Sequence, residues 1–441
     1  MARTQKVTAA IVRLWDQEVG AVAWDADHGR GGGLGTFEYA SSFARQNLHV
    51  APITMPLPSL GVGRIFNFPE LNRQTFRGLP GLLADALPDR FGNALIDLWL
   101  ARHGRAPGDF SPVERLCYMG TRAMGALEFH PVIGPRQRTA VPIEVNQLAD
   151  LAAQILEKRA KLSVSLKSAK ADALQKIIQV GTSAGGARAK AVIAWNPQTH
   201  EVRSGQVATP PGFQHWLLKF DGANQQTLGE AAGFGRIEYA YHLMARAAGI
   251  DMTDCRLFEE GTRAHFMTRR FDRTPSGEKL HVQSLCAIGH YDFNAPGQAS
   301  YEQAMAIIQQ LNMGHPALEQ LFRRMLFNVI ARNQDDHTRN IAFLMNPAGT
   351  WSLAPAFDVI WSFNPAGDWT HRHQMRINGN QDDFTRADFL AVAKQFKIRA
   401  PLDILDQVRR AVTHWPRFAD EAKIPAKTRR HIAHTHRSII T

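Results

Sequence analysis

The chain has 441 residues, of which 44% are hydrophobic and 21% charged, a balance typical of a globular protein with two or three domains. The count of 51 basic against 40 acidic residues gives a net charge of +11, which favours polyanionic partners only weakly. Three separated cysteines argue against a disulfide framework, and no apolar run approaches the roughly 20 residues of a membrane span. With no apolar core of a signal peptide near the N-terminus, we expect a cytoplasmic protein without a membrane partner.

The N-terminal third changes from strands to helices. Residues 7–53 contain short β-branched and aromatic runs such as VTAAIVRLW and VGAVAWD, which predict strands. Apolar residues recur at helical spacing over 79–104, with a break at Pro88. A Pro/Gly-rich and charged stretch at 133–142 is a candidate linker, and an amphipathic helix is expected directly after it.

The segment VGTSAGGARAK (180–190) is a Gly-rich loop before an apolar strand. Gly181 and Gly186 have the spacing of a phosphate-binding P-loop, and bare backbone N–H groups in such loops can face an anion. A P-loop continues with lysine and Ser/Thr, whereas Ala187 and Arg188 follow here. The sequence therefore does not predict a P-loop and leaves Ser183 to be explained.

A lysine interrupts the next apolar strand, HWLLKF. Lys219 would be expensive to bury without a partner, so it is either an edge residue facing water or a paired, phosphate-binding lysine. Glu238, on the helix RIEYAYHLMARAAGI, is the main candidate for an ion pair, and Glu230 is also close in sequence.

The stretch from 328 to 359 holds a cluster of polar residues beside a predicted hairpin. A helix ends near Asn333, and strands IAFLM and TWSLA follow with the turn NPAG between them. In an antiparallel hairpin the start of one strand lies beside the end of the next. Asp335, Asn340 and Asp358 are therefore expected at one end of this hairpin.

Two carboxylates and an amide at one place fit phosphoryl transfer. Mg²⁺ takes oxygen ligands, keeps several waters and bridges phosphates, and a separate carboxylate orients the attacking hydroxyl. The order D-x-x-x-x-N, hairpin, Asp, preceded by a strand lysine, is typical of protein kinases. The alternative is an ordinary polar loop in which Asp335 caps a turn.

Taken together, GTSAGGARAK, HWLLKF, RRFDR, NQDDHTRN and LAPAFDV, with LLADALPDRFG and MGTRAMGALEFHP upstream, resemble the HipA family of serine/threonine kinases, the toxins of type II toxin–antitoxin modules. The resemblance runs from about residue 8 to about residue 410. It implies an α+β, bilobal protein-kinase-like fold with an extra N-terminal mixed subdomain and a mainly helical C-terminal lobe. The expected parts are an N-terminal subdomain (1–112), a strand-rich N-lobe with the Gly-rich loop (113–270) and a helical C-lobe (271–441).

The resemblance also implies a role for each motif residue. Asp335 matches the catalytic aspartate, and Asn340 and Asp358 match the magnesium ligands. Lys219, with Glu238 as its ion-pair candidate, matches the lysine that contacts the phosphates of ATP.

The same resemblance extends to the Gly-rich loop and the adenine-binding segment. Ser183 matches the loop serine that such kinases autophosphorylate, while Gly185 and Gly186 match the glycines that cover the phosphates. Arg269 to Phe271 match the segment that meets the adenine, although Arg269 stands where an acidic residue is common. Asp336 stands where glycine is common.

The function implied is an ATP- and Mg²⁺-dependent serine/threonine kinase that phosphorylates a translation component, often an aminoacyl-tRNA synthetase. The family's partner is a small helix-turn-helix antitoxin, HipB-like, that binds operator DNA. Two alternatives are a small-molecule phosphotransferase with a similar Asp/Asn/Asp set and a non-catalytic corepressor that acts with a DNA-binding partner.

Overall fold

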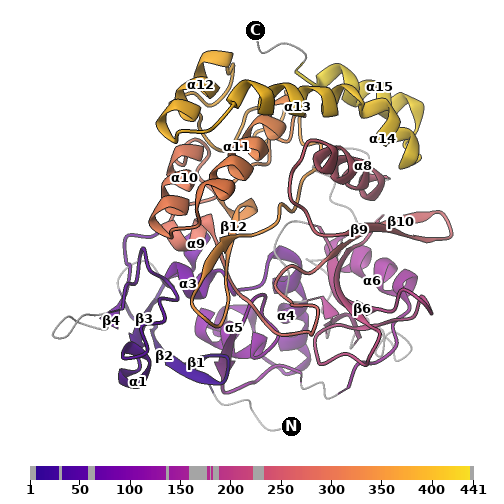
Figure 1. The fold of residues 1–441 in the computed structure, drawn as a ribbon. Helices are drawn as coiled ribbons and strands as arrows, with labels where there is room; N and C mark the ends of the chain where they lie inside the picture. The colour runs from indigo at the N-terminus through magenta and orange to yellow at the C-terminus, as the bar shows by residue number, and fades with distance from the viewer. Residues whose placement is uncertain are drawn as a thin grey trace.

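The computed structural model places strand-rich parts below a mainly helical part (Figure 1). The residues that the structure describes are 6–28, 32–57, 65–135, 139–157, 176–178, 180–181, 188–221 and 233–437.

The N-terminal part is built on a five-stranded antiparallel sheet in the order β4-β3-β2-β1-β5. Its strands are β1 (Ala9–Leu14), β2 (Gln17–Asp25), β3 (Leu34–Tyr39), β4 (Ile65–Phe66) and β5 (Leu127–His130). Alternate residues of β1 are buried, as expected for a sheet with one face on the core. Because β5 pairs with β1, the chain returns to the first sheet after its helices.

Short and medium-length helical segments also belong to this N-terminal part. They are α1 (Ser41–Ala44), α2 (Arg73–Phe76), α3 (Gly81–Ala84), α4 (Arg90–Arg102), the 3-10 turn η2 (Pro107–Asp109) and α5 (Pro112–Met119). Helices α1 and α5 pack on the first sheet. Helix α4 begins where the Asp89 carboxylate accepts a hydrogen bond from the N–H of Gly92, 2.7 Å away. Helix α5 begins with a capping box formed by Ser111 and Glu114.

A second antiparallel sheet has the order β7-β6-β8-β10-β9. Its strands are β6 (Lys190–Trp195), β7 (Val202–Ser204), β8 (Gln214–Lys219), β9 (Cys255–Glu260) and β10 (Arg263–Arg269). Helix α6 (Val145–Glu157) precedes it, and α8 (Phe234–Ala247) lies between β8 and β9 in sequence and packs on β10 and β9. All six residues of β6 are buried, so this strand lies in the middle of the protein.

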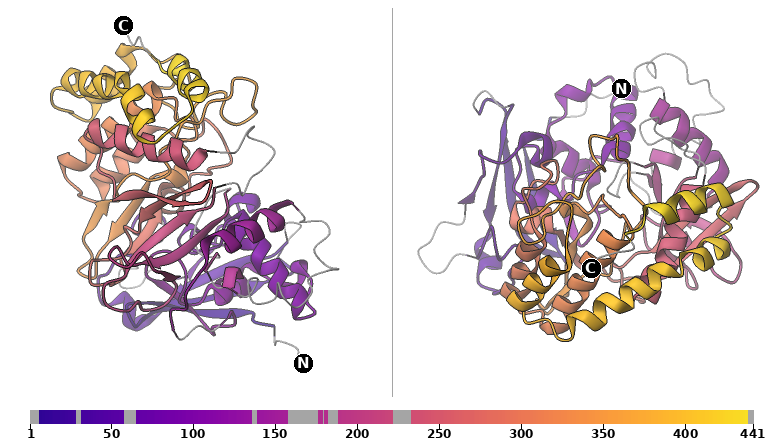
Figure 2. Two further views of the ribbon diagram at one scale, coloured as in Figure 1. Left: turned by 90° about the vertical axis from the view of Figure 1, so that its right-hand side faces the viewer. Right: turned by 90° about the horizontal axis from the view of Figure 1, so that it is seen from above.

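The remainder is mainly helical around a small three-stranded sheet, β11-β12-β13. Its elements are β11 (His281–Ser284), α9 (Leu285–Gly289), α10 (Tyr301–Gln310), α11 (His315–Ile330), η4 (Thr338–Asn340), β12 (Ala342–Met345), β13 (Trp351–Leu353), α12 (Arg386–Gln395), α13 (Pro401–Thr413), α14 (Trp415–Glu421) and α15 (Ala426–Thr435). Figure 2 shows α12 to α15 stacked on the side away from the N-terminal sheet.

Specific contacts join the N-terminal part to the rest. The carboxylate of Asp85 accepts hydrogen bonds from the N–H and the hydroxyl of Ser284, at 2.7 and 2.8 Å. The carboxylate of buried Asp272 accepts one from the N–H of Gly125 at 2.7 Å. One hydrophobic core also continues from the first sheet to the C-terminal helices.

The predicted α+β class is therefore confirmed, with strands at 7–53, helices over 79–104 and the hairpin after Asn340. The expected limits at residues 112 and 270 stay a prediction. No helix in the described ranges combines the length and apolar character that a membrane crossing requires.

Candidate active site

Two lysines enter the site side by side from the second sheet. Lys190 begins β6 and Lys219 ends β8, and these two residues are direct partners across the antiparallel pair. Residues opposite each other in a sheet project to the same face. Both residues are buried, and their side chains are 3% and 9% exposed. Burial of two adjacent cations requires nearby carboxylates.

Lys219 is paired as the sequence indicated, but with two partners. Its Nζ lies 2.5 Å from Oε1 of Glu238 on α8 and also contacts Oδ1 of Asp358. Burial alone would lower the pKa of Lys219, yet Asp358 and Glu238 together raise it. For Asp358, burial raises the pKa, but Lys219 and Lys190 outweigh that effect and hold it well below its ordinary value. The interpretation of Lys219 as a solvent-facing edge residue is thus wrong.

Lys190 was not identified from the sequence, although a lysine at the head of the apolar run KAVIAW was a usable signal. Its Nζ lies 3.9 Å from Oδ2 of Asp89, and both side chains are 3% exposed. Burial lowers the pKa of Lys190 despite the attraction of Asp358 and Asp89. Asp89 belongs to the N-terminal part, which therefore reaches the lysine pair directly.

The loop between α11 and β12 holds the predicted catalytic residues. Nδ2 of Asn340 donates a hydrogen bond of 2.8 Å to the carbonyl of Asp335, which closes the loop and leaves the amide oxygen for another ligand. The hairpin forms as predicted, and the N–H of Ala354 extends it by donating to the carbonyl of Ala342 at 2.9 Å. The chain then leads to Asp358, whose φ of 52° is uncommon for a residue with a side chain. Backbone strain of this kind concentrates at functional sites.

His337 lies next to Asp335, with 3.8 Å between its Nε2 and Oδ1 of the carboxylate. Asp335 is 38% exposed, so a group from solvent can reach it. Nε1 of Trp369 donates a hydrogen bond of 2.6 Å to the same Oδ1. From the sequence, His337 was noted only as one residue of the polar cluster after Asn333, without a role, and Trp369 was not identified.

Asp336 points into the protein rather than to the site. Its carboxylate accepts hydrogen bonds from the hydroxyl of Tyr301 (2.9 Å) and the N–H of Gln374 (2.8 Å), and Oδ2 lies 2.9 Å from Nδ1 of His373. Nε2 of Gln374 in turn donates hydrogen bonds to the backbone carbonyls of Gln334 and Trp369, at 3.2 and 2.6 Å. These bonds hold the loop that carries Asp335 against the segment 364–376.

A small internal cavity lies beneath the site. Its volume is about 20 Å³, which is room for about one water molecule. Asn340 lines it together with Phe357 and Val359, the residues on either side of Asp358 in the chain. Arg324 of α11 also faces it, and its buried Nε makes no hydrogen bond within the described part of the chain.

The structure positions only part of the expected adenine and phosphate contacts. Phe271 packs on Phe357, with ring centroids 5.3 Å apart, next to Asp358. Arg269 ends β10, its N–H donates to the carbonyl of Asp254 at 2.8 Å, and its guanidinium lies 3.9 Å from the Asp254 carboxylate. Ser183, Gly185 and Gly186 lie outside the described residues.

The donor set fits a hard divalent cation held with nucleotide phosphates. Mg²⁺ commonly takes one or two protein oxygens and completes its shell with water and phosphate. Asp358, kept ionised by its low pKa, and the amide oxygen of Asn340 are oxygen donors of this kind. Across the described ranges, no three His, Cys, Asp or Glu side chains cluster as a self-sufficient metal site would.

Comparison with known proteins gives two family matches. A family model of the HipA-like C-terminal domain matches residues 182–416, and one of the HipA N-terminal domain matches residues 10–130. The first covers more than half of the 441 residues.

Solved structures are similar as well. HipA of Shewanella oneidensis MR-1, from a complex of that toxin–antitoxin system with HipB and operator DNA, gives a TM-score of 0.64 at 16% identity, over 96% of this chain and 94% of that chain. At this identity the match describes the fold alone, and it extends over nearly all of both chains. A Helicobacter pylori proinflammatory kinase, CtkA, covers 50% of this chain and 84% of that one at 10% identity, with a TM-score of 0.34, too low to support an argument. The predicted two-lobed, kinase-like fold with an additional N-terminal part is confirmed.

Proposed function

Since the chain belongs to the HipA family, we propose that it is an ATP- and Mg²⁺-dependent serine/threonine protein kinase that acts as the toxin of a toxin–antitoxin module. The observation that carries the proposal is the contact of buried Lys219 with both Glu238 and Asp358. A strand lysine, a helix glutamate and the aspartate after the hairpin therefore meet at one point, and this arrangement supports a role in phosphoryl transfer.

The residues divide the chemistry between them. When bound, Mg²⁺ at Asn340 and Asp358 would neutralise charge on the phosphates of ATP. Lys219 and Lys190 supply fixed positive charge beside the same phosphates, in a site where burial strengthens electrostatic attraction. Phe271 is proposed to lie along the adenine, with Arg269 at its edge.

Asp335 is proposed as the base. The hydroxyl oxygen of a serine or threonine attacks the γ-phosphorus, the bond to the β–γ bridging oxygen breaks, and ADP leaves. The hydroxyl proton passes to the carboxylate of Asp335, which is exposed enough to receive a protein substrate. On the proposed Gly-rich loop, Gly185 and Gly186 cover the phosphates and Ser183 is a site of autophosphorylation.

The proposed partners follow from the family and from charge. The Shewanella structure contains HipB and operator DNA, and a helix-turn-helix antitoxin of that kind is proposed here. The excess of 51 basic over 40 acidic residues would contribute unspecific, salt-sensitive attraction to DNA, with sequence recognition supplied by the partner. The proposed substrate is a component of translation, and the proposed location is the cytoplasm.

The test measures transfer of radiolabelled γ-phosphate to dephosphorylated casein, and in parallel to an aminoglycoside and a sugar. MgATP should raise the melting temperature, and Asp335→Asn and Asp358→Asn should abolish transfer while the protein stays folded. Transfer to the small molecules alone would favour a small-molecule phosphotransferase. Absence of both MgATP binding and transfer would leave the non-catalytic corepressor.

A further inference from the structure

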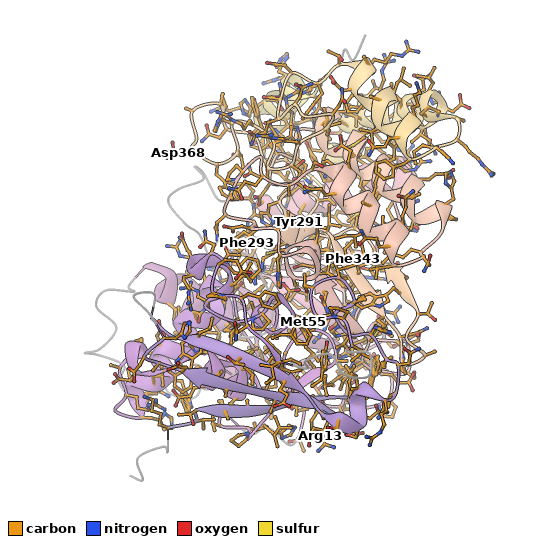
Figure 3. All side chains as sticks on the ribbon, turned by 90° about the vertical axis from the view of Figure 1, so that its left-hand side faces the viewer. Arg13, Met55, Tyr291, Phe293, Phe343 and Asp368 are labelled. Atoms are coloured by element: carbon orange, nitrogen blue, oxygen red, sulfur yellow. The ribbon has the colours of Figure 1, made fainter. Side chains whose placement is uncertain are left out.

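The segment 364–376 carries a residue that acts on the proposed catalytic carboxylate. Trp369 lies in the run DWTHRHQM (368–375), 34 residues after Asp335. Its neighbour Asp368 lies at the margin of the molecule in Figure 3, so this segment borders solvent. Trp369 itself is half-buried, and its ring centroid lies 6.3 Å from that of His337.

The contact distinguishes the two oxygens of Asp335. Oδ1 accepts the indole N–H of Trp369 at 2.6 Å and faces His337 at 3.8 Å. No side chain in the described part of the chain donates a hydrogen bond to Oδ2. A carboxylate on a surface loop otherwise rotates between equivalent orientations, whereas a charge-assisted hydrogen bond to one oxygen fixes its plane.

Gln374 joins the backbone of Trp369 to the two residues that flank Asp335. Nε2 of Gln374 donates to the carbonyl of Trp369 at 2.6 Å and to that of Gln334 at 3.2 Å. The N–H of Gln374 donates to Asp336 at 2.8 Å, and Asp336 is buried. Through Gln374, the backbone around Trp369 is therefore connected to Gln334 and Asp336, the residues before and after Asp335.

We propose that Trp369 is a positioning residue for phosphoryl transfer: its indole N–H holds Oδ1 of Asp335 and directs Oδ2 to the incoming serine or threonine hydroxyl. The inference rests on the proposed kinase function. Trp369 orients the base and leaves nucleotide binding untouched, since the lysine pair and Asp358 are built from other elements. The proton of the acceptor hydroxyl goes to Oδ2, and the indole keeps its own proton throughout.

The experiment compares Trp369→Phe with Trp361→Phe in the full chain. Both changes remove an indole N–H and keep an aromatic ring, but Nε1 of Trp361 donates to the hydroxyl of Thr435 at 2.9 Å, away from the carboxylates. Trp369→Phe should lower kcat for casein phosphorylation roughly tenfold or more, because a hydrogen bond to a charged group is involved. Its KM for ATP and the MgATP shift in melting temperature should stay at wild-type values. Trp361→Phe should stay within about twofold of wild type in kcat.

A second measurement does not need a substrate. In ¹⁵N-tryptophan-labelled protein, the indole resonance lost in Trp369→Phe should shift strongly in Asp335→Asn and stay in place in Asp97→Asn, a partly exposed aspartate of α4. An unshifted resonance, or a Trp369→Phe enzyme with unchanged or raised kcat, would overturn the inference. A wild-type chain that neither binds MgATP nor transfers phosphate would instead refute the kinase function, and the indole resonance would still test the contact.

Discussion

Asp89 of the N-terminal part and Lys190 of the second sheet face each other in the interior, 3.9 Å apart between Oδ2 and Nζ. This distance is long for an ion pair, and Oδ2 makes no hydrogen bond to any residue that the structure describes. Burial raises the pKa of Asp89 to about 7, although Lys190, the N–H of Gly92 and Arg339 all act to lower it. The carboxyl group therefore changes charge near neutral pH.

Asp89→Asn should stabilise the protein at high pH only. The unfolded pKa of an aspartate is about 3.9, so between pH 4 and 7 the native state holds a proton that the unfolded state releases. The stability contributed by this proton is complete below pH 4 and is lost as the pH rises through 7. Asparagine is as good a helix N-cap as aspartate, so the substitution should not disturb α4. The free energy of unfolding of the variant should exceed that of the wild type by on the order of 1–3 kcal/mol at pH 8 and should equal it at pH 4.

Urea unfolding at pH 4, 5, 6, 7 and 8 measures the difference. Asp109→Asn, at an exposed aspartate in η2, serves as the control and should give the same small change at every pH. An Asp89→Asn advantage that does not vary with pH would show that Asp89 does not titrate in this range.

Lys219→Met should weaken both the fold and nucleotide binding. The substitution leaves Glu238 and Asp358 close together without their shared cation, and breaking a buried pair in this way costs about 3–5 kcal/mol. The MgATP-induced rise in melting temperature should fall to a small fraction of the wild-type value. The double variant with Glu238→Gln should recover part of the stability and none of the nucleotide binding.

Arg246→Met is the matched control for Lys219→Met. Arg246 lies on α8 and faces Asp254 at 3.8 Å, but both side chains are more than half exposed. Exposed pairs contribute little, so the change should stay within about 0.5 kcal/mol. Calorimetry with and without MgATP measures both variants, and an unchanged MgATP shift in Lys219→Met would contradict the proposed role of the lysine.

Asp336→Asn should loosen the segment 364–376 from the catalytic loop. The two oxygens of the buried carboxylate accept hydrogen bonds from Tyr301, His373 and Gln374. The asparagine side chain has only one oxygen that can accept a hydrogen bond, so at least one of these bonds is lost. We expect a loss of about 2–3 kcal/mol in the free energy of unfolding, against about 1 kcal/mol for Tyr301→Phe. Chemical unfolding checks the stability, and faster amide hydrogen exchange around Gln374 checks the location; equal exchange in both proteins would argue against the link.

Ser183 should gain phosphate when the wild-type chain is incubated with MgATP. The added charge of about −1.5 to −2 beside the phosphates of ATP should weaken nucleotide binding. Intact-mass and peptide mass spectrometry locate the phosphate, and Ser183→Ala and Asp335→Asn should both lack it. A wild-type enzyme that phosphorylates casein but never Ser183 would show that this serine has no such role.

The hairpin could be predicted because its signals are local. Pro347 and Gly349 mark the turn, and the apolar runs mark the strands that pair around it. That this pairing brings Asn340 near Asp358 stays a prediction. Lys219 was identifiable for a similar reason, since a lysine in an apolar strand needs a partner. Glu238 was named as that partner, while Asp358, 139 residues away, was not.

The contacts that the sequence did not predict are those that leave no periodic pattern of apolar residues. Trp369 reaches Asp335 from an irregular segment, and Asp89 reaches Lys190 from the N-terminal part, across from the second sheet. Neither distance along the chain nor residue type points to these pairings, because they arise from how separate elements pack. Asp336 was noted only as an unusual residue, and its burial under Gln374 and His373 became apparent from the structure.

The first 130 residues contribute Asp85 to the start of α9, Asp89 to the lysine pair and Gly125 to the carboxylate of Asp272. These contacts join the N-terminal part directly to the rest of the protein. A gene fragment that begins at the second sheet would therefore encode a protein with exposed core and unmatched buried charges, which a cell would degrade. Recombination between related genes should accordingly exchange these two parts together, and corresponding residues on the two sides should change in concert during evolution.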